Sequence, residues 1–242
     1  MTDTEAGTTG TDTTRTTVTG AETTGAETTG VETTGAETTG TTRTGGTGTP
    51  PSLDLGPQAR VVAGLVRGVD EDLLAGRTPC PELAVRNLLG HLLHLAVAFR
   101  DAARKDLGVT TDTAPDTVVP DIGPGWRGEL PRALDALAAA WRDPDAWTGA
   151  TRAGGVDLPG EVAGVVAADE LVIHGWDLAR ATGQEYRPDP AALSASYRFL
   201  RAAAGEPDSG GGLFGPVVPV PEGAPLLDRA VGLSGRDPGW TP

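Results

Sequence analysis

Residues 159–183 read PGEVAGVVAADELVIHGWDLARATG, and this stretch predicts one long helix that ends where a glycine follows Thr182. Glycine favours such an ending because it adopts the left-handed conformation that terminates many helices. Glu170 and His174 are one turn apart, so their side chains leave the same face, and Asp177 extends that face by a further turn. The stretch therefore predicts a helix with a polar group on one face.

The other residues on this face are small or apolar: Ala163, Val166, Ala167 and Ala181. Small side chains around polar ones leave a recess, whereas a solvated stripe would carry long charged residues paired three or four positions apart. An inward-facing carboxylate without a partner is costly, and a metal ion would supply that partner. We therefore interpret Glu170 and His174 as two ligands of a divalent metal.

The third ligand is expected from an earlier helix, residues 81–105, which carries His91 and His94. The apolar stripe of this helix consists of Val85, Leu88, Leu92, Leu95 and Phe99. On a helical wheel, His91 lies at the edge of the stripe, whereas His94 lies roughly 60° further out. His91 is therefore the better inward candidate.

Together, His91, Glu170 and His174 offer nitrogen, oxygen and nitrogen donors. Three protein ligands with one open position are typical of catalytic zinc, whereas structural zinc sites more often use four ligands rich in cysteine. Nickel, iron and manganese also accept such a set. Zinc is the metal that we predict.

Simpler interpretations of these residues stay open. A histidine in an apolar helix is more often a core residue than a ligand, and the Glu-x-x-x-His spacing is frequent by chance. His94 is expected to be partly exposed, to support a ligand from outside the coordination sphere, or to form a two-histidine half-site with His91. Asp177 is expected to orient a ligating imidazole or to belong to a polar patch. No catalytic residue is assigned.

Helical periodicity recurs along much of the chain. The expected helices span residues 55–74, 81–105, 130–142, 159–182 and 190–204, with a short one at 226–231. Residues 110–125 and 149–158 are expected to be loops, the second with a short extended piece at 156–158. Since strands are scarce, the pattern predicts an all-α bundle, and residues 52–242 are long enough for one domain with a sizeable core.

The first 51 residues differ sharply from the rest in composition. They consist almost wholly of Thr, Gly, Glu and Ala, and residues 21–40 read AETTG, AETTG, VETTG and AETTG. Such a segment buries too little apolar surface to fold, so residues 1–51 are predicted to be a disordered tail. The start, MTDTEAGTTG, lacks the basic residues and apolar stretch of a secretory signal, so we do not expect export.

The formal net charge of -14, with 19 scattered basic residues, argues against nucleic acid as a partner. The single cysteine, Cys80, excludes an intramolecular disulfide, and no apolar stretch is long enough to span a bilayer. We therefore expect a cytoplasmic protein that acts on a small molecule. The oligomeric state is not predicted.

Several short motifs occur in a familiar order. They are TPCPE at residues 78–82, VRNLLGHL at 85–92, DELVIHGWDLARATGQ at 169–184, FGPVVPV at 214–220, APLLDR at 224–229 and GRDP at 235–238. Through them, residues 53–240 resemble the actinobacterial metal-binding branch of the DinB-like superfamily. Within that branch, the chain is similar to the N-terminal domain of mycothiol-dependent maleylpyruvate isomerase.

This resemblance implies an up-and-down four-helix bundle, here with an extra helix and a loop-rich C-terminal segment. It also implies a metal held by one histidine of the second helix and a Glu-x-x-x-His pair of a later one, positions that fall on His91, Glu170 and His174. Members of the superfamily include thiol S-transferases that use mycothiol or bacillithiol. The isomerase has a separate C-terminal domain, where this chain shows only a short loop-rich segment, so the isomerase activity is not carried over.

The leading hypothesis is a zinc-dependent S-transferase that joins mycothiol to a small electrophile. A divalent cation at an open site favours thiolate over thiol, and thiolate is the attacking species. The same site would lower the pKa of a bound water, so a metal-dependent hydrolase is the first alternative. The second is a non-enzymatic metal-binding or interaction module, which leaves open whether the chain is an enzyme.

Overall fold

The structure is a computed structural model that describes residues 53–114, 119–204 and 215–242. The predicted tail, residues 1–51, lies outside the described residues. The helices are α1 (Gly56–Arg67), α2 (Val85–Arg104), α3 (Val109–Asp112), α4 (Trp126–Ala140), α5 (Gly160–Thr182), α6 (Pro190–Ala203) and α7 (Leu226–Leu233). The strands in the described ranges form one hairpin, β1 (Ala150–Ala153) and β2 (Val156–Pro159), which confirms the all-α class.

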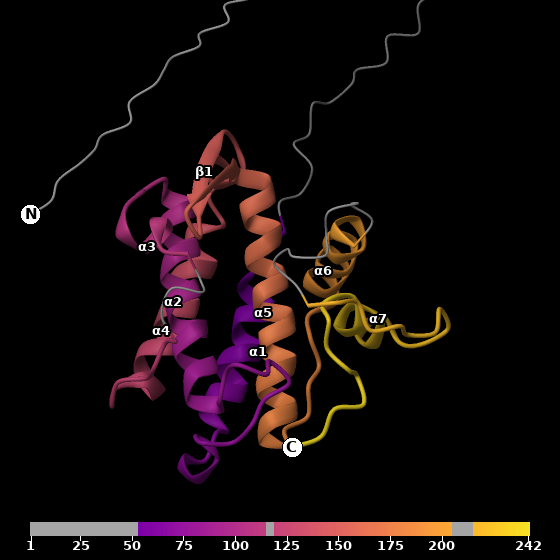
Figure 1. Ribbon diagram of the computed structural model, residues 1–242. Coiled ribbons are helices and arrows are strands. Elements are labelled where there is room, and N and C mark those ends of the chain that lie inside the picture. Colours follow the sequence, from indigo (N-terminus) through magenta and orange to yellow (C-terminus); the bar gives the residue numbers. More distant parts are fainter. Residues whose placement is uncertain (1–52, 115–118, 205–214) are drawn as a thin grey trace, which may run out of the picture. The chain divides into compact units, whose positions relative to one another are not determined.

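Four long helices form the bundle, in which α1 and α2 each pack against both α4 and α5 (Figure 1). Helices α2 and α4 run in the same direction. Near their ends, the Trp141 indole donates to the Phe99 carbonyl at 3.0 Å, and near their starts Asn87 donates to the Pro120 carbonyl at 2.8 Å. The described residues just before α4 therefore lie beside the start of α2, where Pro120 contacts Asn87 and Asp121 contacts Arg86.

Gly90 lets these residues approach α2 closely. A Cβ at this position would lie 3.0 Å from the backbone nitrogen, carbon and oxygen of Asp121, so only glycine fits without a shift of the chain. One turn earlier, Arg86 forms an ion pair with Asp121 at 2.8 Å. These contacts fix the backbone directly before His91.

The core lies between the four long helices. Its fully buried leucines come from α2, α4, α5 and the residue before α1, and are Leu55, Leu88, Leu89, Leu92, Leu130, Leu134, Leu137, Leu171 and Leu178. Each such side chain contributes about 1.5–3 kcal/mol through burial. Among the described residues, no helix has the length and apolar character needed to cross a membrane.

Two predicted helices are shorter than expected. Helix α1 ends at Arg67 and not at Leu74, because Gly68 caps it and the Gln184 side chain occupies the place where a Cβ of Gly68 would lie. A short 3-10 turn, Glu71–Leu73, follows. Helix α2 begins at Val85 and not at residue 81, since the Thr78 hydroxyl lies within hydrogen-bonding distance of two carbonyls in the preceding turn, at 2.7 and 2.8 Å.

At residues 149–158, the extended piece predicted at 156–158 is confirmed as β2, but the predicted loop before it contains β1, which pairs with β2 in antiparallel register. Gly154 and Gly155 form the turn between the strands, both with positive φ, 59° and 78°. Two glycines between short strands are typical of the tight turns that match strand twist. The expected loop at residues 110–125 also contains the short helix α3, while α4 begins four residues before the predicted start at Leu130.

The C-terminal helices pack outside the four-helix bundle. Helix α6 packs on α5, and α7 packs on α6, around a small second core of Val172, Ile173, Ala192, Leu200 and Ala230. Beyond α7, the chain returns to α5, where Arg180 donates to the carbonyls of Pro238 and Trp240 at 3.3 and 2.6 Å. The loop-rich C-terminal segment is thus held against the helix that carries Glu170 and His174.

Candidate metal centre

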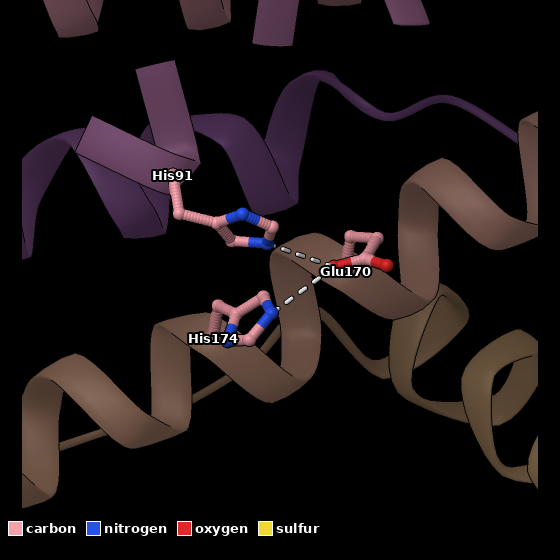
Figure 2. Close-up of side chains that lie close together, drawn as sticks. All are labelled: His91, Glu170 and His174. Carbon is pink, nitrogen blue, oxygen red and sulfur yellow. Dashed lines mark ion pairs between the residues drawn. The ribbon is translucent and has the colours of Figure 1, made fainter. Parts of the chain in front are cut away.

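Helices α2 and α5 bring three predicted ligands together (Figure 2). His91, in the second turn of α2, faces Glu170 and His174 in the middle of α5. Glu170 Oε2 lies 3.7 Å from His91 Nε2 and 3.1 Å from His174 Nε2. One donor atom from each residue lies within 4.8 Å of the other two. The three side chains therefore converge on a common point.

The donor set fits a divalent metal. A tetrahedral zinc ion with bonds of about 2.0–2.2 Å separates its ligand atoms by about 3.3 Å. Two of the three donor separations, 3.1 and 3.7 Å, lie on either side of that value, and the third is within 4.8 Å. The two imidazole rings meet edge to face, at 81° with centroids 4.6 Å apart. Three protein donors leave a fourth position open.

Solvent reaches the three ligands unequally. The side chains of His91 and Glu170 are 19% and 28% exposed, whereas that of His174 is 10% exposed. Ala163 and Ala167, on the same face of α5, are fully buried. A metal held by the trio would therefore be reached by solvent from the side of His91 and Glu170.

Asp177 holds the second nitrogen of His174. The imidazole Nδ1 lies 2.9 Å from Asp177 Oδ2, and a proton placed on Nδ1 by this carboxylate leaves Nε2 as the nitrogen that faces Glu170. Asp177 is fully buried and also accepts from Arg236, 3.2 Å from the same oxygen. Sequence reasoning included Asp177 as a candidate for orienting an imidazole but missed Arg236, whose only sequence signal is the GRDP motif.

Other polar groups near the trio are placed differently. His94 is exposed and makes no hydrogen bond to the trio, so the structure leaves it outside the group. Asp169, beside Glu170, instead accepts from Ser196 of α6 at 2.6 Å. Cys80 is half-buried, and burial raises the pKa of its thiol to about 11, although the positive charge of Arg236 lowers it. A neutral Cys80 thiol is a poor nucleophile.

Without a metal, Glu170 and His174 form a charged pair. Burial alone would raise the pKa of Glu170, but the imidazoles of His174 and His91, 3.1 and 3.7 Å away, outweigh it and hold this pKa well below its usual range. Burial would also lower the pKa of His174, but hydrogen bonds to Asp177 and Glu170 outweigh it and raise this pKa to about 9. At neutral pH, the metal-free site therefore carries a proton where the metal would bind.

Metal binding should displace this proton. We expect zinc affinity to increase with pH up to about 9, and binding at pH 7 to release about one proton. The metal-free fold should show the opposite trend, because the stabilisation from charged His174 is complete below its ordinary pKa of 6.5 and is lost as pH rises through about 9. Calorimetric titrations in buffers of different ionisation enthalpy measure the released proton. Binding that is independent of pH and buffer would contradict this expectation.

Comparisons with known proteins point in one direction. The family described as the mycothiol maleylpyruvate isomerase N-terminal domain matches residues 55–179, which include all three candidate ligands. Two relatives, uncharacterized proteins from two strains of Mycobacterium tuberculosis, are each 27% identical over 185 residues, covering 72% of this chain and 91% of the relative. No solved structure matches the chain.

Proposed function

The chain belongs to the mycothiol maleylpyruvate isomerase N-terminal domain family, and from this membership we propose a zinc-dependent S-transferase that joins the sulfur of mycothiol to a small electrophile. The observation that carries the proposal is the convergence of His91, Glu170 and His174 on one solvent-accessible point. A cytoplasmic location is part of the proposal, since low-molecular-weight thiols are kept reduced there.

The charges around the site suit a thiol substrate. Two neutral imidazoles and one carboxylate leave a divalent cation with net positive charge, because the charge of Asp177 is balanced by Arg236. A bound divalent metal would favour the thiolate form of a thiol at the open position. The side chains of His91 and Glu170 are partly exposed, so a thiol would reach a metal held there from the solvent side.

The roles of the chain's own groups follow from their contacts. Asp177 orients His174 through Nδ1, while Glu170 and His91 present their donor atoms from facing helices. As the new carbon–sulfur bond forms, the leaving group of the electrophile departs with its electron pair. The thiol proton passes to solvent through the exposed side, since neither exposed His94 nor neutral Cys80 is placed to accept it.

The test compares zinc-loaded and metal-free protein with mycothiol and a chromogenic aryl halide. We expect a thioether product that requires both zinc and mycothiol, followed by absorbance and mass spectrometry. Bacillithiol and glutathione in place of mycothiol test the identity of the thiol. Zinc-loaded protein that conjugates none of these thiols would remove the main support for a transferase.

Two control reactions separate the alternatives. Turnover of chromogenic esters without any thiol would favour a metal-dependent hydrolase, because water would then be the nucleophile at the open position. Tight zinc binding without turnover in either reaction would favour a non-enzymatic metal-binding module. In that case, a metal-dependent gain in thermal stability would identify a structural role.

A further inference from the structure

The segment after α7 reaches back to the metal centre through one side chain. Arg236 Nη2 donates to Asp177 Oδ2 at 3.2 Å, and Nε donates to Asp177 Oδ1 at 3.4 Å. The guanidinium thus contacts both oxygens of a carboxylate that is fully buried. Such two-point contacts fix orientation as well as charge. Arg236 itself is mostly buried, with 13% of its side chain exposed.

The end of α7 aims Arg236 toward α5. Gly235 adopts a left-handed conformation with φ of 81°, the Gly235 amide donates to the Gly232 carbonyl, and the Arg236 amide donates to the Val231 carbonyl, both at 3.1 Å. This pair of bonds is the Schellman motif, in which glycine ends the helix and sets the direction of the next residue. The Arg236 side chain is held further by the Ser234 carbonyl at 2.9 Å.

Without Arg236, the Asp177 carboxylate would keep a single charged partner, His174. A buried carboxylate with a poor set of partners is costly, so it would rotate or draw in water. The imidazole that it holds would then lose its fixed orientation. Outer hydrogen-bond partners of metal ligands typically contribute 10- to 100-fold to metal affinity.

We propose that Arg236 is a positioning residue of the metal centre, which holds Asp177 and through it orients His174 for metal binding. This inference rests on the proposed metal site but not on the transferase reaction. It extends the centre beyond the residues that match the family, since Arg236 lies 59 positions after Asp177 and outside residues 55–179. The C-terminal segment is then part of the metal centre.

The test measures zinc affinity of the full chain by chelator competition. Arg236→Gln should bind zinc about 10- to 100-fold more weakly than wild type. Arg180→Gln is the matched control, because Arg180 holds the same segment through the carbonyls of Pro238 and Trp240 but has no bond to Asp177. It should keep wild-type affinity. Arg236→Lys keeps the positive charge but cannot contact both oxygens of Asp177 as the guanidinium does. It should therefore lose less zinc affinity than Arg236→Gln and should fold even if that variant does not.

Cobalt absorption spectra add a readout that a purely structural role would not change. The ligand-field bands should shift in Arg236→Gln and stay unchanged in Arg180→Gln. Only the first variant removes the partner of Asp177, so only there should the His174 imidazole lose its fixed orientation. Equal affinity of wild type and both Arg236 variants would overturn the positioning role, as would equal losses in Arg236→Gln and Arg180→Gln. A wild-type chain that binds no metal would overturn the metal site as well. Metal binding without thiol turnover would reject only the transferase.

Discussion

Wild-type chain should hold about one zinc ion, and replacing His91, Glu170 or His174 with alanine should abolish stoichiometric binding. In the proposed site each of these residues would supply one of three protein donors, so each substitution should cost more than the roughly 10- to 100-fold typical of an outer partner. Elemental analysis after dialysis against a weak chelator measures the bound metal. Among the variants, His174→Ala should lose the most, because this side chain is the most buried of the three.

His94→Ala is the matched control for His91→Ala. Both histidines lie on α2, three residues apart, but His94 is exposed and stands outside the cluster. His94→Ala should therefore keep the full metal content. Full metal content in His91→Ala would contradict the assigned ligand set. Circular dichroism of each variant distinguishes loss of a ligand from loss of the fold.

Trp141→Ala should produce the largest loss of stability among the substitutions considered. The side chain is 1% exposed, its indole nitrogen donates to the Phe99 carbonyl, and its ring meets that of Trp147 at a centroid distance of 5.0 Å. Truncation of a buried tryptophan typically costs about 3–5 kcal/mol, because it removes buried area and leaves a cavity. Urea unfolding followed by circular dichroism measures the change in the free energy of unfolding.

Two further variants sharpen this prediction. Trp141→Phe keeps most of the apolar ring but loses the hydrogen bond, so it should cost less than Trp141→Ala. Val109→Ala changes a side chain that is 84% exposed and should stay within about 0.5 kcal/mol of wild type. A loss below about 1 kcal/mol in Trp141→Ala would show that this part of the core repacks. Phe99 lies two turns from His91, about 12 Å along α2, so folded Trp141→Ala should still bind zinc.

Residue spacing alone predicted the long helices well. The predicted span 159–182 agrees with α5 to within one residue, because its composition and the glycine after Thr182 act locally. The end of α1 and the start of α2 were less accurate. Gln184 packs on Gly68 and the Thr78 hydroxyl bonds the turn before α2, and neither contact follows from helical periodicity.

At residues 150–159, the extended piece of β2 was predicted, but β1 and the pairing of the two strands were not. The sequence contains a local signal for the turn, the dipeptide Gly154-Gly155. In the structure, both glycines adopt the positive φ angles of a tight two-residue turn. Each strand has only four residues, too few for alternation of apolar and polar side chains to stand out. The hairpin is further held from outside, because Thr151 donates to the Ala102 carbonyl of α2.

The sequence by itself determined which residues share a helical face, and so it selected Glu170 with His174 and favoured His91 over His94. Helical spacing is a local property, which makes such choices possible without a structure. Only the tertiary structure decided that the two faces meet at one point and that Arg236 joins Asp177 across 59 positions. Contacts of this kind depend on how separate helices pack and on where the chain returns after α7, and no periodicity within one helix encodes them.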